Sequence, residues 1–309
     1  MYHLLSKSEK TIYNKKTIMK VLGIGNAIVD VLCKVSNDFL IKNSLQKSTM
    51  KLVNEDEFKK LLSSLKIEET ISGGSVANTI VGLAQQGNSV GFIGKINDDE
   101  LGLNYEIGLN KENVKYLYNK KKENLPTGTC LILITPDSER TMCTFLGSAG
   151  SITDQDIDLK AIKKSEIVLL EGYLWDKGEP KKAFEKTIKY AKKTAMSLSD
   201  IFCVERHKDD FLNLVKNKLD IVFANEQEIM SLINAKKFQD VIEFAKKINK
   251  YLVITRGAKG SMTLYNGKVI EQPAKEGIKI VDLTGAGDLF AAGYLNGYLK
   301  KLSIEECLF

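Results

Sequence analysis

The chain carries two patterns of apolar and polar positions. From residue 165 onward, short apolar runs alternate with longer amphipathic segments, as expected for strands and helices in turn. The expected strands are Ile167–Leu170, Ala195–Ser199, Ile221–Ala224 and Tyr251–Thr255, and the expected helices are Pro180–Lys193, Glu205–Lys216, Gln227–Ile233 and Phe238–Lys250. This alternation predicts an α/β fold, an αβα sandwich around a doubly wound, mostly parallel central sheet.

The N-terminal half mixes this pattern with a second one. We expect strands at Lys20–Gly25 and Ser89–Ile93 and helices at Glu55–Lys66, Ser75–Gln86 and Asp99–Leu109. Two β-rich stretches, at about residues 31–53 and 113–146, do not fit the α/β alternation, and the second holds expected strands at Val114–Tyr118, Thr129–Ile134 and Arg140–Phe145. We expect these stretches to form a small separate β-sheet, a lid over the mouth of the body.

The composition is that of an ordinary soluble globular protein, with 43% hydrophobic and 27% charged residues in a chain of 309. No apolar run reaches the roughly 18 residues of a membrane span. The first residues are polar and Lys-rich and lack the apolar stretch of a secretory signal. Because Met19 stands directly before the first strand, we expect it to be the start residue, with residues 1–18 a disordered extension and 19–309 one folded domain.

Charge and cysteine content indicate which kinds of partner and which cell compartment to expect. The net charge of +6 comes from Lys residues spread among Asp and Glu, so a nucleic-acid partner is not expected. The five cysteines have no metal-ligand spacing, which is typical of reduced thiols in a cytoplasmic protein. We expect a cytoplasmic protein with a small-molecule partner and no membrane partner. Exposed lid strands could pair between subunits, so a monomer and a lid-mediated homodimer both stay open.

A Gly-rich turn near the C-terminus carries the strongest chemical signal. The apolar run Ile278–Val281 leads into Asp282-Leu283-Thr284-Gly285-Ala286-Gly287-Asp288, and a helix of small residues begins at once. The first N–H groups of a helix lack partners within the helix, and the helix dipole places a partial positive charge there. Because Gly285, Ala286 and Gly287 have almost no side chains, an anion can bind directly to these amides.

Asp288 projects from the same turn, where its carboxylate would repel a bound anion. The pairing is explained if Asp288 accepts a proton from a hydroxyl group while the amides hold the phosphoryl group that this hydroxyl attacks. The turn therefore predicts phosphoryl transfer to an alcohol. The alternative is an ordinary helix N-terminus whose acidic residue compensates the dipole.

Two segments in the first third of the chain suit recognition of hydroxyl groups. Asn26 and Asp30 follow the first strand, and Gly73-Gly74 precedes a helix that carries Asn78. Paired glycines let a ligand approach the backbone, and amide and carboxylate groups bond hydroxyls. The structural alternatives are a turn carboxylate at Asp30 and a glycine turn capped by Ser75.

Two strand ends in the second half suit a nucleotide and its metal. Asn225 and Glu228 could hold Mg²⁺ through its waters, or could simply cap the next helix. After the following strand, Thr255, Gly257 and Gly260 could contact a nucleotide through the backbone, or could form a plain turn. No Gly-x-x-x-x-Gly-Lys-Ser/Thr segment is present, which excludes a P-loop.

Three further side chains are ambiguous. Arg140, on an expected lid strand, is either an edge charge or a guanidinium that faces the transferred phosphoryl group. Trp175 and Phe202 either stack on a purine or belong to the core.

Four motifs, in this order and spacing, resemble those of the ribokinase-like (PfkB) carbohydrate and nucleoside kinase family over roughly residues 19–309. They are Gly73–Asn78, Asn225-x-x-Glu228, Thr255-x-Gly257-x-x-Gly260 and Asp282-x-Thr284-Gly285-Ala286-Gly287-Asp288. Finer detail is similar to the adenosine kinase branch, namely Gly25-Asn26 with Asp30, Asp38–Leu40, Pro126–Cys130 and Leu198-Ser199-x-x-Phe202.

The resemblance implies an αβα body with a β lid and transfer of the ATP γ-phosphate to a primary hydroxyl, which in the adenosine kinase branch is the ribose 5′-OH, giving AMP. The implied roles are Asp288 as base, the amides of Gly285, Ala286 and Gly287 as anion hole, Arg140 at the phosphate, Asp30, Gly73, Gly74 and Asn78 at the ribose, Asn26 and Phe202 at the nucleoside, Thr255, Gly257 and Gly260 at the nucleotide, and Asn225 and Glu228 at Mg²⁺.

Two alternatives stay open. The first is a sugar kinase of the same family, acting on ribose, fructose or 2-keto-3-deoxygluconate. The last of these is an acid that would require a cationic pocket, for which Arg140 is the obvious lid candidate. The second is a non-catalytic ligand-binding homologue. It is prompted by the C-terminus, because the family usually continues with a helix that walls the ATP base, whereas this sequence ends at Phe309.

Overall fold

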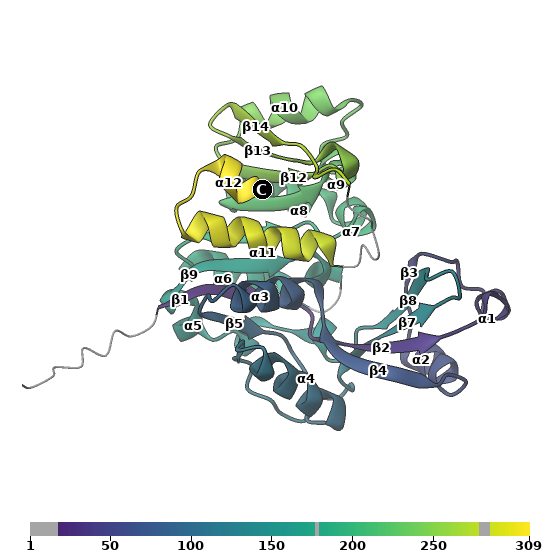
Figure 1. Ribbon diagram of the computed structural model, residues 1–309. Coiled ribbons are helices and arrows are strands. Elements are labelled where there is room, and N and C mark those ends of the chain that lie inside the picture. The colour runs from purple at the N-terminus through teal and green to yellow at the C-terminus, as the bar shows by residue number, and fades with distance from the viewer. Residues whose placement is uncertain (1–17, 177–178, 278–284) are drawn as a thin grey trace, which may run out of the picture.

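The computed structural model describes residues 18–176, 179–277 and 285–309, and within them nine strands form the larger of two sheets (Figure 1). In spatial order these are β14 (Lys268–Gln272), β13 (Ser261–Tyr265), β12 (Tyr251–Thr255), β11 (Ile221–Asn225), β10 (Thr194–Ser197), β9 (Ser165–Glu171), β1 (Met19–Ile24), β5 (Val90–Ile93) and β6 (Lys115–Tyr116). All neighbours pair in parallel except along β13, which is antiparallel to both β12 and β14. The predicted mostly parallel α/β sheet is confirmed.

Helices cover both faces of this sheet, because alternate residues of its strands point to opposite sides. In β9, Ile167 and Leu169 join one core, whereas Val168 and Leu170 join the other. The first core also contains residues of α3 (Ser75–Gln85), α4 (Glu100–Lys111), α11 (Ala286–Leu299) and α12 (Ile304–Leu308). The second contains residues of α5 (Leu159–Lys164), α6 (Pro180–Tyr190), α7 (Ile201–Arg206), α8 (Lys208–Asn217), α9 (Glu226–Leu232) and α10 (Phe238–Lys246). Short 3₁₀ turns lie at Ala149–Ser151, Asp154–Asp156, Gly172–Asp176 and Gly257–Lys259.

A second, five-stranded sheet projects from one side of the body (Figure 1). Its order is β3 (Met50–Leu52), β8 (Arg140–Phe145), β7 (Gly128–Ile134), β2 (Ile28–Lys34) and β4 (Ile67–Gly73). One face is covered by α1 (Asn37–Lys42) and α2 (Glu55–Leu62), whose Leu40 and Phe58 are buried against it. The other face presents a smaller apolar cluster that includes Ile28, Ile132 and Leu146. We call this second sheet the lid sheet.

Three elements differ from the sequence-based expectation. Strand β4 was not expected, because its residues are mostly polar and its Ile67 and Ile71 are exposed rather than buried. Helix α1 was also not expected, within a stretch described as β-rich. The segment expected as a lid strand at Val114–Tyr118 instead contributes β6 to the larger sheet, because α4 returns the chain parallel to β5.

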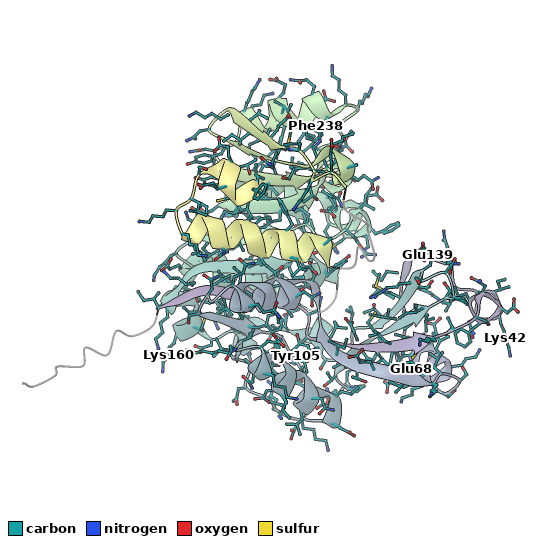
Figure 2. All side chains as sticks on the ribbon, in the orientation of Figure 1. Lys42, Glu68, Tyr105, Glu139, Lys160 and Phe238 are labelled. Atoms are coloured by element: carbon teal, nitrogen blue, oxygen red, sulfur yellow. The ribbon has the colours of Figure 1, made fainter. Side chains whose placement is uncertain are left out.

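The body and the lid sheet meet at strand ends that are held by two tyrosines, Tyr105 and Tyr116. Tyr105 of α4, labelled in Figure 2, donates from its hydroxyl to the carbonyl oxygen of Gly73 at 3.0 Å, and its side chain is fully buried. Tyr116 donates in the same way to the carbonyl oxygen of Gly94. These bonds fix the ends of β4 and β5 beside the junction.

None of the helices in the described ranges is long and apolar enough to cross a lipid bilayer. The five cysteines are all buried free thiols.

Candidate active site

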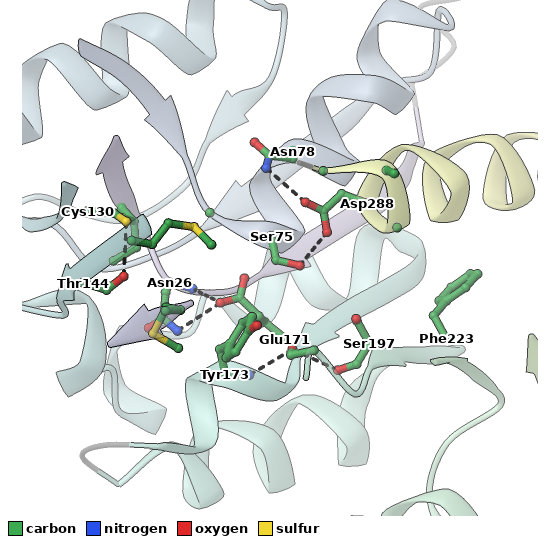
Figure 3. A pocket seen from close by; sticks show the side chains of 18 of the residues that line it. Asn26, Ser75, Asn78, Cys130, Thr144, Glu171, Tyr173, Ser197, Phe223 and Asp288 are labelled. Atoms are coloured by element: carbon green, nitrogen blue, oxygen red, sulfur yellow. Dashed lines mark hydrogen bonds between the residues drawn. The ribbon is translucent and has the colours of Figure 1, made fainter. Parts of the chain in front are cut away.

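A cavity of about 460 Å³ lies between the carboxyl edge of the larger sheet and the lid sheet (Figure 3). Ends of parallel strands are the usual ligand site of an open α/β sheet. The described residues that line it from the larger sheet and its helices are Asn26, Gly74, Ser75, Asn78, Glu171, Tyr173, Ser197, Ser199, Phe223, Ala224, Asn225, Glu228, Val253, Thr255, Gly285 to Asp288 and Phe290. Those from the lid sheet and its margins are Ile28, Asp30, Met50, Leu52, Cys130, Ile132, Met142, Thr144 and Leu146.

Asp288 is held at the floor of this cavity by α3 (Figure 3). Ser75 Oγ donates to Asp288 Oδ1 at 2.7 Å, and Asn78 Nδ2 donates to Asp288 Oδ2 at 3.1 Å. Burial raises the pKa of the Asp288 carboxyl above its ordinary value, and these two hydrogen bonds oppose the rise. A carboxylate that is fixed in orientation and made more basic suits a general base.

The N-terminus of α11 is open toward the cavity. Gly285 is the N-cap residue of α11 and has a φ of +72°, a left-handed conformation that favours glycine. A Cβ atom added at Gly287 would meet no described heavy atom within 4 Å, so a ligand can approach the backbone there. The expected juxtaposition of these small residues with Asp288 is therefore present, whereas Asp282 and Thr284 of the same motif lie outside the described residues.

Asn26, Asp30, Gly73 and Gly74, which the sequence indicated for hydroxyl binding, gather beside the start of α3. Asn26 is 2% exposed, and its Oδ1 atom is buried without a hydrogen-bond partner among the described residues. Asp30, on β2, lies so close to Gly73 that a Cβ atom there would stand 2.2 Å from its Oδ2 atom. Burial raises the pKa of Asp30 to about 7, and the charge of Arg140 opposes this rise. Gly74 is the N-cap of α3 and lines the cavity. Gly73 lies next to Asp30 and is not among the lining residues.

Glu171 is a cavity residue that sequence reasoning missed. It is the last residue of β9, is 1% exposed, and accepts hydrogen bonds from Asn26 and from the backbone of Val76. No motif marks it. The available signal was a carboxylate directly after the apolar run Ile167–Leu170, at the same sheet edge as Asn26 and Asn225.

Asn225 and Glu228 form a capping box at the start of α9. The backbone N–H of Asn225 donates to Glu228 Oε2 at 3.0 Å, and the backbone N–H of Glu228 donates to Asn225 Oδ1 at 2.8 Å. The capping alternative is thus confirmed, and both residues also line the cavity. Burial, with a smaller contribution from the charge of Asp200, raises the pKa of Glu228 to about 7. A nearby cation would relieve this unfavourable burial.

Direct coordination of a metal by protein side chains has little support here. Across residues 18–176, 179–277 and 285–309, no group of three or more His, Cys, Asp or Glu side chains could hold an ion. A pair such as Asn225 and Glu228 suits Mg²⁺, which keeps several waters and takes further oxygens from phosphates.

The aromatic residues expected at a purine are elsewhere. The ring of Trp175 packs at 4.8 Å from that of Phe184 and 5.9 Å from that of Phe211, and its Nε1 donates to Asp210. The stacking role predicted for Trp175 is therefore wrong, and the core alternative holds, because the ring completes the core under α6 and α8. Phe202 is 64% exposed on α7 and does not line the cavity.

Three other expected residues also lie outside the cavity lining. Gly257 and Gly260 shape the turn between β12 and β13, where Gly260 packs against the backbone of Gln272, so only Thr255 of this motif reaches the cavity. Arg140 begins β8 at the rim of the lid sheet, and its charge acts on Asp30. Contact of these three with a nucleotide or phosphate stays a prediction.

Comparison with known proteins agrees with this geometry. The model of the pfkB family carbohydrate kinases matches residues 53–309. Adenosine kinase 2 of Arabidopsis thaliana is 27% identical, in an alignment that covers 93% of this chain and 90% of that protein. The 5-dehydro-2-deoxygluconokinase of Clostridium botulinum is 28% identical, in an alignment that covers 82% of this chain and 80% of that protein.

Solved structures give the same result. The adenosine kinase from Sinorhizobium meliloti superposes with a TM-score of 0.86 at 35% identity, covering 94% of this chain and 90% of that one. A probable sugar kinase from Rhizobium etli CFN 42 superposes with a TM-score of 0.87 at 33% identity over the same shares. The chain therefore belongs to the PfkB family of carbohydrate kinases and is a phosphotransferase, with ATP as the phosphate donor that this family implies.

Proposed function

We propose that the protein transfers the γ-phosphate of ATP to the primary hydroxyl of a nucleoside, and that its substrate is adenosine, phosphorylated at the 5′-OH to give AMP. The observation that carries the proposal is the position of Asp288, held by Ser75 and Asn78 beside the open turn of Gly285 to Gly287. A base and an anion-binding turn at one end of a single cavity are the parts that phosphorylation of an alcohol requires.

The sugar hydroxyls are expected to bind at the wall formed by Asn26 and Asp30. The unpartnered Oδ1 of Asn26 is a buried acceptor that a ligand hydroxyl would satisfy, and an unsatisfied buried polar atom is costly. An ionised Asp30 accepts two more hydroxyl hydrogens. A substrate bound at this wall would lie between the lid sheet and Asp288.

In the proposed reaction, Asp288 accepts the proton of the 5′-OH as the hydroxyl oxygen attacks the γ-phosphorus. The new bond joins that oxygen to phosphorus, the bond from phosphorus to the β-phosphate oxygen breaks, and ADP leaves with the electron pair. The backbone N–H groups at residues 285–287 stabilise charge on the phosphoryl oxygens.

Asn225 and Glu228 are the residues we propose to hold Mg²⁺ through its waters. They fit because they are oxygen donors in the cavity and because Glu228 is a buried carboxylate in need of a counter-charge. When bound, the ion would neutralise negative charge on the phosphates.

The lid sheet supports a nucleoside over a sugar acid. Its cavity-facing side chains include Ile28, Ile132, Met142 and Leu146, which offer apolar surface to a planar base. No Lys, Arg or His stands among the described residues that line the cavity, so a sugar carboxylate would lack a counter-ion. A neutral sugar would leave most of the apolar wall uncovered.

The test is ATP-dependent phosphorylation of adenosine, ribose, fructose and 2-keto-3-deoxygluconate side by side, with ADP release as the readout and the product identified by mass spectrometry. We expect adenosine to have the highest kcat/KM. A sugar that exceeds adenosine would refute the nucleoside assignment. No turnover of any acceptor would refute the proposed reaction and favour the non-catalytic alternative.

A further inference from the structure

We propose that Glu171 is a positioning residue that ties the end of β1 to the first turn of α3 and so holds Asp288 in place for proton transfer. The inference rests on the proposed function, because it concerns the base of the same reaction.

Both carboxylate oxygens of Glu171 accept hydrogen bonds from protein donors, and Figure 3 shows the contact with Asn26. Glu171 Oε1 accepts from the backbone N–H of Asn26 at 3.2 Å and from Asn26 Nδ2 at 3.0 Å. Glu171 Oε2 accepts from the backbone N–H of Val76 at 3.0 Å. The side chain is 1% exposed, so water does not replace these bonds. Glu171 therefore joins two chain segments rather than standing free to bind a substrate.

The segment that Glu171 holds is the one that orients Asp288. Val76 lies between Ser75 and Asn78 in the first turn of α3, and these two side chains donate to the two oxygens of Asp288. Thr79, one residue further, donates to the carbonyl oxygen of Asp288 at 3.1 Å. A shift of the first turn of α3 would alter all three bonds, and displacements of about 1 Å are enough to slow catalysis ~10²-fold.

The role requires an ionised side chain. An ionised carboxylate has lone pairs on both oxygens and can accept all three N–H groups. A protonated carboxyl or a Gln amide carries hydrogen on one side, which would face a donor and break at least one bond. The geometry thus links the charge of Glu171 to the position of α3.

The surroundings of Glu171 bring the pH at which its carboxyl group loses its charge close to neutral. Burial is the main cause that raises the pKa of Glu171 to about 7, the hydrogen bonds from Val76 and Asn26 lower it, and the charge of Asp288 raises it. Tyr105 on α4 and Tyr173 after β9 also face Glu171, and both stay neutral because their own pKa values are raised. Below pH 7 the folded protein therefore binds a proton at Glu171 and loses one bond.

The test uses Glu171→Gln, which keeps the size of the side chain, and Asp220→Asn as a matched control. Asp220 Oδ2 accepts from the backbone N–H of Thr194 at 2.7 Å, at the opposite edge of the same sheet. For both variants and the unmodified protein, kcat and KM for adenosine are measured from pH 6 to 8, together with the melting temperature and amide hydrogen exchange of residues 74–79.

At pH 8 we expect kcat of Glu171→Gln to fall at least ~10-fold. The ratio of unmodified to variant kcat should shrink toward pH 6 by up to ~10-fold, because the ionised fraction of a group with a pKa of about 7 changes by that factor. Exchange of residues 74–79 should be faster in Glu171→Gln than in the unmodified protein, and Asp220→Asn should change neither.

An unchanged kcat in Glu171→Gln would overturn the inference. A kcat ratio that is the same at pH 6 and 8 would also overturn it, because a purely structural contact has no such pH dependence. If the unmodified protein phosphorylates no acceptor, the proposed function fails. The exchange measurement then still decides whether Glu171 holds α3, and unchanged exchange would contradict it.

Discussion

Asn78 Nδ2 donates to Asp288 Oδ2 at 3.1 Å, which joins two residues 210 positions apart in the chain. The bond crosses the contact between α3 and α11, the two helices whose N-termini face the cavity (Figure 3). It makes the Asp288 carboxylate an oriented acceptor and moderates the rise of its pKa caused by burial. The proposed substrate recognition near α3 and the proposed proton transfer at α11 would thus share one hydrogen-bonded unit.

Replacing Asn78 by Asp would put a second carboxylate beside Asp288. Like charges so close oppose ionisation of the pair, so the apparent pKa of the base should rise further. Because the base must be ionised, the acid limb of the kcat–pH profile is expected to move upward by about one unit or more. Asn78→Ser, which adds no charge, is the control. An acid limb that stays in place in Asn78→Asp would argue against Asp288 as the titrating base.

Gly73 controls the position of Asp30. In Gly73→Ala, the new Cβ would stand 2.2 Å from Asp30 Oδ2 and 2.6 Å from Cγ, so the carboxylate must move. We expect KM for the acceptor to rise about 10-fold or more while kcat changes less, since lost substrate binding outweighs lost chemistry. Gly293→Ala, which meets open space on α11, is the matched control and should keep both constants. An unchanged KM in Gly73→Ala would show that Asp30 does not contribute to binding of the acceptor.

Asp30 is expected to lower the stability of the folded protein at neutral pH. Its folded pKa of about 7 lies above the ordinary value of 3.8, so keeping it ionised in the fold is unfavourable. The penalty grows as pH rises from about 4 to 7 and is complete above that. Asp30→Asn should therefore melt at a higher temperature than the unmodified protein at pH 8, with a smaller gain at pH 5, while losing acceptor binding. A lower melting temperature at pH 8 would contradict this assignment.

Substitutions of the two aromatic residues outside the cavity, Trp175 and Phe202, test whether either ring contributes to substrate binding. Trp175→Phe removes a buried ring system and the bond to Asp210, so we expect a loss of about 1–3 kcal/mol of unfolding free energy with an unchanged KM for adenosine. Phe202→Ala should change neither quantity, because the ring is exposed. Thermal melts and Michaelis constants for both variants check this. A large rise in KM for either would place that ring at the substrate.

The Gly-rich turn was predictable because its chemistry is local. Gly285 to Asp288 are adjacent in sequence, and a helix N-terminus without side chains presents its amides wherever it is folded. The capping box of Asn225 and Glu228 is local for the same reason. The regular alternation after residue 165 predicted the parallel sheet, and with it the edge at which these groups gather.

The features that were not predicted depend on three-dimensional contacts, which sequence patterns do not specify. Glu171 bonds to Asn26 across 145 residues, and only the pairing of β1 with β9 places them together. Strand β4 escaped detection because the outer strand of the lid sheet buries few side chains and so needs no apolar alternation. The composition around Trp175 did not distinguish a ring that packs in a core from one that stacks on a ligand.

The central claim is that Asp288 deprotonates an acceptor hydroxyl beside the turn at Gly285 to Gly287, and its most direct test is the turnover of Asp288→Asn. This variant keeps the size of the side chain and should still accept a bond from Ser75 or Asn78, so it should fold and bind adenosine. With ATP, Mg²⁺ and adenosine, we predict that kcat falls by at least ~10²-fold, up to ~10⁴-fold, at a nearly unchanged KM. Turnover close to that of the unmodified protein would contradict the account.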